Sequence, residues 1–411
     1  MAFPLEGKVA RAKRVTEGGI SPTNSNLYFI LNYSFLLVIM ILKGDEIMSK
    51  ELPKTYKSFT EWDEKSKQIE YTEETPLLDK DGTLLAKGWA RRNVFTYDRN
   101  LSSPKYRKKE WDFYIIRNKN MIVELSFANI SIGGYVCAKL VDLQNQKVIA
   151  EANYMYVGGE SKYILPPKGD VPNYFRANVR QAQVEFDTHE TYRTLWFKAP
   201  CNGKTVECNF HMDILPNHEN ITTVLPFKDN PTRYFMTTKQ NCMPVSGTYK
   251  YGNDVYEFSK EDTFCYMDWG RVNTPYSLVW YWGNGAQYVY DENGEKHIFG
   301  FEITWAIGDE SYATETCLFW DGKAHKIGAV DVEKFPKDRY MEEWKIISDD
   351  GRFNLTLTPT YDYESQFDIG VAGTHCHQVN GVWNGTVILD DGREIEIKNL
   401  HSWCEYVENH W

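Results

Sequence analysis

The sequence predicts an all-β protein of two antiparallel β-barrel domains with little helix. Turn dipeptides that supply positive φ angles recur along the chain, with Asp-Gly at four places and Asn-Gly at five. Between these turns, apolar and polar residues alternate with a period of two, which is typical of strands with one buried face. Aromatic residues make up 15% of the chain, and large rings favour sheets over helical bundles. Many short strands joined by close turns indicate a sandwich or a barrel.

The first element in chain order, residues 1–47, is expected to be a non-native or disordered extension. Residues 27–42 form one apolar run behind a basic stretch, as in a signal peptide or signal anchor. The run is shorter than the roughly 20 residues of a membrane span. No small-residue cleavage site follows it. We therefore expect Met48 to be the true start, with a membrane anchor through 27–42 as the alternative.

The remaining chain divides into a short segment and two domains. Residues 48–74 form an N-terminal segment in which a Ser or Thr cap predicts one short helix, over 58–70. Turn signals become dense from residue 75, so the first barrel is expected over 75–225 and the second over 240–411. The boundary is placed near 215–240 because three prolines interrupt the alternation there.

Period-two runs locate individual strands within both domains. MIVELSF at 121–127 alternates apolar with polar residues, and so do FGFEITW at 299–305 and GRFNLTLTP at 351–359. The segment VILDDGREIEIK at 387–398 reads as a complete hairpin around an Asp-Gly turn. These runs justify the barrel assignment at the level of single strands.

Composition excludes several classes of function. The net charge is −11 with scattered basic residues, which argues against nucleic acid and anionic lipid as partners. None of the eight cysteines forms Cys-x-x-Cys, so we expect buried, reduced thiols in a cytoplasmic protein with no integral membrane span in its mature domain. A phosphate-binding glycine loop, a Gly-x-Ser-x-Gly elbow and a His-Glu-x-x-His motif are missing from the sequence.

The segment 266–285 is the best candidate site because it has the highest density of aromatic residues. Asp268 and Arg271 are the expected catalytic residues: a carboxyl desolvated among rings can serve as a proton donor. The alternative is a buried Asp268–Arg271 pair that holds a bend at Gly270. Trp280 and Trp282 should face the same way on a strand. The expected ligand-binding residues are Trp269, Tyr276, Trp280, Trp282, Glu315, Trp111 and Asp112.

Other segments carry weaker signals. In KKEWDFY, Glu110 and Asp112 flank Trp111 and can form an acid or base beside an aromatic wall, or simply a strand start neutralised by lysines. Cys242 is expected to be a packed thiol, since no Cys-His pattern surrounds it. A carbohydrate site would pair Asp268 with Glu315 or Asp309.

In the sequence THCHQ the two histidines are two residues apart, so both would project from one face of a strand, as two metal ligands can. No third ligand is obvious beside His375 and His377, although His401, Cys404 and His410 lie downstream. We therefore predict no metal site and no cofactor.

Seven motifs together resemble the bacterial family called domain of unknown function 2804. They occur in order over about 70–411: GWARRN, KKEWDFY, QNCMPVSG, MDWGR, FGFEITWAIGDESYATET, LFWDGKAHKI and SDDGRF. A fainter resemblance links the C-terminal part, including its late Glu405, to calycin-like proteins such as carotenoid hydratases and tocopherol cyclases. That resemblance implies two lipocalin-like barrels and an isoprenoid-like ligand.

These observations lead to a functional expectation with two alternatives. The first is a protein that binds a small hydrophobic molecule, such as a lipid or isoprenoid, in a barrel cavity. One alternative is an acid-catalysed hydratase, cyclase or isomerase that acts on an unsaturated apolar substrate, with Asp268 as the acid. The other is a carbohydrate-binding or carbohydrate-active protein, and whether the chain is an enzyme stays open.

Overall fold

The structure is a computed structural model that describes residues 65–410 except 160–161, 229, 335–338 and 371. Within these residues the chain is all-β and antiparallel, with one nearly closed barrel sheet and one half-barrel sheet, as predicted. Regular helix in this part of the chain amounts to a 3₁₀ turn, η3 (Lys105–Arg107). The two short strands β1 (Thr75–Pro76) and β3 (Phe95–Thr96) form a separate parallel pair.

The first sheet forms the nearly closed barrel. Its strand order is β7-β6-β5-β4-β15-β13-β11-β10-β9-β8, and β2, β12 and β14 pair beside this path. The edge strand β7 contacts β10, which lies two strands in from the other edge strand β8: the Tyr154 hydroxyl donates to the carbonyl of Pro200 at 2.7 Å. The strands are β2 (Gly88–Ala90), β4 (Lys108–Arg117), β5 (Met121–Asn129), β6 (Gly133–Asp142), β7 (Lys147–Val157), β8 (Asn173–Val179), β9 (Ala182–Thr188), β10 (Tyr192–Cys201), β11 (Lys204–Asp213), β12 (Ile221–Phe227), β13 (Asn230–Tyr251), β14 (Asp254–Phe258) and β15 (Phe264–Asn273).

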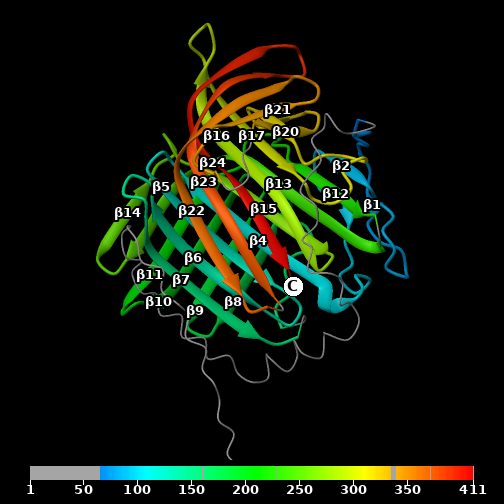
Figure 1. Ribbon diagram of the computed structural model, residues 1–411. Coiled ribbons are helices and arrows are strands. Elements are labelled where there is room, and N and C mark those ends of the chain that lie inside the picture. Colours follow the sequence, from blue (N-terminus) through cyan, green and yellow to red (C-terminus); the bar gives the residue numbers. More distant parts are fainter. Residues whose placement is uncertain (1–64, 160–161, 229, 335–338, 371, 411) are drawn as a thin grey trace, which may run out of the picture. The chain divides into compact units, whose positions relative to one another are not determined.

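The second sheet is the half-barrel and runs from yellow-green to red in Figure 1. Its order is β19-β18-β17-β16-β24-β23-β22-β21-β20, so the last strand of the chain pairs with the first strand of this sheet. The strands are β16 (Ser277–Tyr290), β17 (Lys296–Trp305), β18 (Cys317–Trp320), β19 (Lys323–Lys326), β20 (Val330–Lys334), β21 (Trp344–Ser348), β22 (Phe353–Asp368), β23 (Gly373–Ile388) and β24 (Glu394–His410).

Three apolar layers hold the sheets together. Alternation along β4 shows how they arise: Tyr114 and Ile116 point into the first barrel, whereas Phe113 and Ile115 point to its outer face. The concave face of the second sheet has its own core, which includes Phe301. The third layer lies where the outer faces of β4, β13 and β15 meet those of β16, β17 and β24, and we call this layer the seam.

The change of sheet lies later in the chain than the predicted boundary at 215–240. The first sheet continues through β15, and the second begins with β16, so the change falls at 274–276. Pro226 and Pro231 lie on strands of the first sheet, and Pro216 lies in the turn between β11 and β12. Pro226 pairs with Tyr234 beside an irregularity in the β12–β13 ladder, and such positions tolerate a missing N–H donor.

Two further predictions concern the N-terminal part. Residues 1–47, with the apolar run 27–42, lie outside the described residues, and so does 58–64 of the expected helix. The described remainder of that helix, 65–70, is not helical and ends in a bridge from Glu70 to Trp89. In the described part of the chain, no helix has both the length and the apolar character needed to span a membrane.

Candidate functional site

Asp268 and Arg271 lie on opposite faces of β15, so the predicted pair between them does not form. Arg271 points into the first barrel, where its Nη2 donates to the Asp112 carboxylate at 2.9 Å. Asp268 points into the seam and contacts the amine of Lys239 at 2.8 Å. The reason is the strand period: residues three apart on a strand face opposite ways. Gly270 is a regular strand residue rather than a bend.

Lys239 is the centre of the polar cluster in the seam. Lys239 on β13 stands directly opposite Asp268 on β15 in the ladder, so the two side chains share the seam face. Its Nζ also lies 3.9 Å from Oε2 of Glu315 and 4.0 Å from the ring centre of Trp282. The hydroxyl of Thr237, two residues earlier on β13, donates to the other oxygen of Glu315. The Lys239 amine therefore interacts with the carboxylates of Asp268 and Glu315 and with the ring face of Trp282.

The second sheet adds two more carboxyls to this cluster. Glu302 on β17 accepts a hydrogen bond of 2.8 Å from the indole N–H of Trp282. Glu405 on β24 accepts 2.9 Å from the indole N–H of Trp280 and 3.4 Å from the side-chain amide of Gln378. The registers explain the grouping, because Glu405 stands opposite Trp282 on one neighbour and opposite Gln378 on the other. The resulting site is called the seam cluster: Lys239, Asp268, Glu302, Glu315 and Glu405.

Burial raises the pKa of the three glutamates in the seam cluster. Desolvation is the largest cause for each, and it raises the pKa of Glu302 to about 8 and that of Glu405 to about 7. The pKa of Glu315 is also raised, for the same reason. Lys239 opposes the shift at all three carboxyls, and Asp268 adds to it. The pKa of Lys239 itself rises to about 12, because its acidic neighbours outweigh its own desolvation.

This arrangement places a neutral acid and a charged pair in one apolar layer. A carboxyl with a pKa near 7 can give a proton and take it back at neutral pH. Asp268 and Glu405 retain 8% and 6% exposure, whereas Glu302 is fully buried. The reachable acid is thus Glu405, and the reachable carboxylate beside a cation is Asp268.

Two partly exposed rings lie beside these two groups: Trp280 donates to Glu405, and Phe113 stands opposite Asp268 in the β4–β15 ladder. Trp111, Phe113, Trp280 and Tyr361 pack against the seam layer without being fully buried. The ring of Trp111 lies across Gly270, where a Cβ atom would collide with it. Trp280 and Trp282 share one face of β16, as predicted from their spacing. The face of Trp282 is occupied by the Lys239 amine, so Trp280 is the indole of the two that is left for a ligand.

Several predicted site residues lie elsewhere. Trp269 is inside the first barrel, with the Arg271 guanidinium 4.2 Å from its ring centre. Asp112 is buried beside Arg271 on the same interior face. Tyr276 is 37% exposed and contacts Arg107 outside the cluster, at 5.2 Å from its ring centre. Glu315, by contrast, reaches the seam cluster as noted above.

Lys239 and Glu302 belong to the site but were missed as site residues. Lys239 is part of TTKQNC, where no neighbouring charge marks the lysine as a site residue. Glu302 is one of the polar residues that alternate with apolar ones in FGFEITW, and alternation indicates which residues share a face but not what covers that face. The structure covers it with the other sheet. Cys242, also in this layer, is a buried free thiol whose pKa burial raises.

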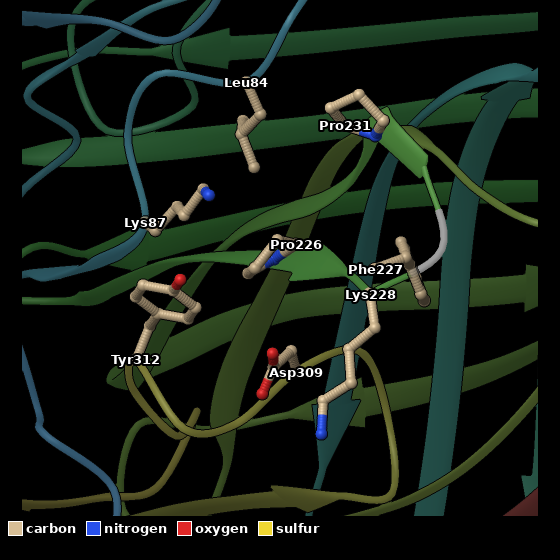
Figure 2. A pocket seen from close by; sticks show the side chains of 8 residues that line it. All are labelled: Leu84, Lys87, Pro226, Phe227, Lys228, Pro231, Asp309 and Tyr312. Carbon is tan, nitrogen blue, oxygen red and sulfur yellow. The ribbon is translucent and has the colours of Figure 1, made fainter.

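A surface pocket of about 260 Å³ lies apart from the seam cluster. Leu84, Pro226, Phe227 and Pro231 form its apolar part, and Lys87, Lys228, Asp309 and Tyr312 its polar part (Figure 2). Asp309, one of the acids considered for a carbohydrate site, therefore faces this pocket rather than Asp268. None of the eight residues that line it belongs to the seam cluster.

Comparison with known proteins gives one family and distant structural likenesses. The model of the family described as "Domain of unknown function (DUF2804)" matches residues 68–411. No curated protein matches the chain. Kievitone hydratase from Nectria haematococca aligns at 10% identity, over 74% of this chain and 88% of its own, with a TM-score of 0.41. A protein from Nitrosomonas europaea described as an AttH aligns at 11% identity, over 76% of this chain and 96% of its own, with a TM-score of 0.37.

Proposed function

The chain belongs to the domain of unknown function family named above, and we propose that its seam cluster is an acid–base site that protonates an unsaturated, largely apolar small molecule. The reaction class is hydration or isomerisation of a carbon–carbon double bond, with Glu405 as the proton donor. Asp268 keeps the role of a site residue, as the charged partner of Lys239 rather than as the acid.

The observation that carries this proposal is the excess of carboxyls over amines in the seam cluster. Four carboxyls, those of Asp268, Glu302, Glu315 and Glu405, all interact with the single amine of Lys239. A purely structural pair needs one carboxylate for one amine, and extra buried acids lower stability. Carboxyls held neutral by burial next to an ionised one are the arrangement with which proteins perform acid–base chemistry at neutral pH.

The proposed first step uses the proton of Glu405. The π electrons of the double bond take this proton to form a C–H bond, and the adjacent carbon becomes a cation while Glu405 becomes a carboxylate. The π face of Trp280 and the negative charge of Asp268 stabilise that cation. Water then adds to the cation and returns a proton to Glu405, which gives hydration. Loss of a neighbouring C–H proton to Glu405 instead gives isomerisation.

The partly exposed rings define where the apolar part of the substrate binds. Trp280 donates its indole N–H to the acid, and Phe113 stands opposite Asp268 in the β4–β15 ladder, so both rings offer flat apolar surface at the site. We place the ligand at the seam, beside the acid, rather than in a barrel cavity. A protein that only binds such a molecule is the competing outcome of the test below.

The test is deuterium incorporation in D₂O. The full chain is incubated with a panel of isoprenoid alkenes and alkenyl phenols, and products are analysed by mass spectrometry. Hydration adds the mass of D₂O, and isomerisation exchanges hydrogen for deuterium at carbon. Glu405→Gln should abolish incorporation and leave the melting transition in place. Glu185→Gln, on the first barrel next to Arg176, is the matched control and should retain activity.

Two results would count against the proposal. One is incorporation by Glu405→Gln at the rate of the unmodified protein. The other is an unmodified protein that binds and co-purifies with an apolar molecule but exchanges no hydrogen in any member of the panel. The second result would establish a binding protein instead of an enzyme.

A further inference from the structure

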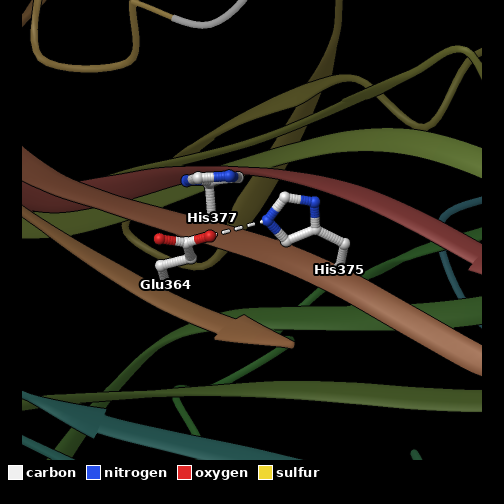
Figure 3. Close-up of side chains that lie close together, drawn as sticks. All are labelled: Glu364, His375 and His377. Atoms are coloured by element: carbon white, nitrogen blue, oxygen red, sulfur yellow. Dashed lines mark hydrogen bonds and ion pairs between the residues drawn. The ribbon is translucent and has the colours of Figure 1, made fainter. Parts of the chain in front are cut away.

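Two histidines and a glutamate converge near one end of the second sheet, on the concave face, opposite the face that carries Glu405. His375 and His377 lie on β23, and Glu364 lies on the neighbouring strand β22. Figure 3 shows the three side chains pointing toward one another, with Glu364 hydrogen-bonded to His375. Their ligand atoms all lie within 4.8 Å of one another.

Strand geometry explains why these residues share one face. His375 and His377 are two apart, and they have the same parity as Val379, which lies in the core on the concave face of the sheet. In the ladder Glu364 stands directly opposite His377. An irregularity between Pro359 and Tyr361 shifts the register of β22, which turns Glu364 toward this face. The sequence could not reveal the third residue, because it depends on that shift.

The distances suit a small ion. The Nε2 atom of His375 lies 2.8 Å from Oε1 of Glu364, and the centres of the two imidazole rings are 4.6 Å apart. A tetrahedral Zn²⁺ with bonds of about 2.0–2.2 Å separates its ligand atoms by about 3.4 Å. Small side-chain rotations therefore bring the three ligand atoms onto one ion.

Asp362 and Tyr340 hold His377 in the orientation that such an ion needs. The Asp362 carboxylate is 2.7 Å from Nδ1 of His377, which leaves Nε2 of the same ring for a metal. A carboxylate on the far nitrogen is the usual support of a histidine that binds zinc. The Tyr340 ring stacks on His377 with 3.7 Å between ring centres.

We propose that Glu364, His375 and His377 form a zinc site with an open fourth position. Two imidazoles and one carboxylate are the protein ligands of a known class of zinc sites in which the fourth position is taken by water or substrate. The side chains of Glu364 and His375 are 55% and 35% exposed, so an ion and a fourth ligand can reach them. Asp362 is a positioning residue and does not bind the ion.

The experiment is a titration of the metal-stripped full chain with Zn²⁺ alone at constant pH, since the affinity of a protein for a metal depends on pH. Isothermal calorimetry should give a saturable isotherm with one site. Co²⁺ should give the visible absorption of a tetrahedral site. Asp362→Asn should weaken Zn²⁺ binding by about 10–100-fold. His375→Ala and His377→Ala should weaken it by more than Asp362→Asn does.

The matched control is His297→Ala. His297 lies near Asp291 and Glu295 in a second group of potential ligands, which contains a single histidine. This change should leave the Zn²⁺ affinity unaltered. Absence of a saturable isotherm for the unmodified protein would overturn the proposal, since the three residues would then be an ion-paired cluster only. An isotherm that His375→Ala and His377→Ala leave unaltered would overturn it as well.

Discussion

Two buried ion pairs on the opposite faces of β15 differ in how their charges are balanced. Inside the first barrel, Arg271 pairs with Asp112 at 2.9 Å, and the neighbouring Glu110 has a cation of its own, Arg99, at 2.8 Å. In the seam, Lys239 meets Asp268 at 2.8 Å but is shared with three more carboxyls. The inner pair is a structural tie. The outer pair belongs to a cluster in which carboxyls outnumber amines. This excess of acids favours a chemical role over a stabilising one.

The hydrogen bonds of Arg271 show what a structural pair looks like. Besides Asp112, its guanidinium donates to the carbonyl oxygens of Trp111 and Gly270 at 2.8 Å each and of Pro166 at 2.6 Å. This cation is fully buried and ties two adjacent strands to a loop. Loss of its carboxylate would leave an uncompensated charge in the barrel core.

The largest expected effect breaks the inner pair. Asp112→Asn should lower the free energy of unfolding by about 3–5 kcal/mol, because Arg271 would keep its charge without a counterion. Asp268→Asn should cost less than about 1.5 kcal/mol, since Lys239 retains Glu315 at 3.9 Å and the crowding of carboxyls is relieved. Urea unfolding of both variants measures the difference. Equal losses would remove the distinction between the two faces.

The next effect concerns the pH dependence of stability. The pKa of Glu302 rises from 4.5 to about 8 on folding, so the folded state holds more protons than the unfolded state between these values. Its contribution is fully present below pH 4.5, and stability falls as the pH rises toward 8, with a slope of up to about 1.4 kcal/mol per pH unit. Glu302→Gln carries no titrating group and should flatten this slope.

Melting curves of the unmodified protein and of Glu302→Gln, recorded between pH 5 and pH 9, measure how steeply stability falls with pH. A Glu302→Gln profile parallel to that of the unmodified protein would contradict the assignment of a raised pKa.

The smallest expected effect tests the influence of Trp280 on Glu405. Its indole N–H donates to Glu405 at 2.9 Å, which stabilises the carboxylate and lowers its pKa against the effect of burial. Trp280→Phe removes the donor and keeps an aromatic ring, so the pKa of Glu405 should rise by up to about one unit. The pH profile of deuterium incorporation should shift by the same amount. A shift to lower pH would show that the indole does not support the ionised form.

Much of the fold could be predicted from the sequence, because the signals for strands and turns lie in short stretches of the chain. Period two in MIVELSF and FGFEITW, with Asn-Gly and Asp-Gly turns between the runs, specifies antiparallel strands without knowledge of distant contacts. The family prediction is confirmed by the match over 68–411. The structure changes sheet at 274–276, and Pro226, one of the three prolines used to place the domain boundary, lies within a paired strand.

The site was less predictable because it depends on contacts between the two sheets. Asp268 was found through the aromatic density around it, and the pairing of Trp280 with Trp282 through strand spacing. Arg271 was wrongly joined to Asp268, since closeness in sequence outweighed the face on which each side chain lies. Lys239 and Glu302 reach the cluster from strands that the sequence does not bring together.

The most direct test of the account is a titration of the seam carboxyls themselves. Carbon-13 NMR of the full chain, labelled at the glutamate carboxyl carbon, follows each group as the pH changes, and Glu405→Gln and Glu302→Gln assign the two signals. The account predicts carboxyls that titrate near pH 7 for Glu405 and near pH 8 for Glu302. A spectrum in which every glutamate carboxyl titrates below about pH 5.5, the ordinary range, would contradict it.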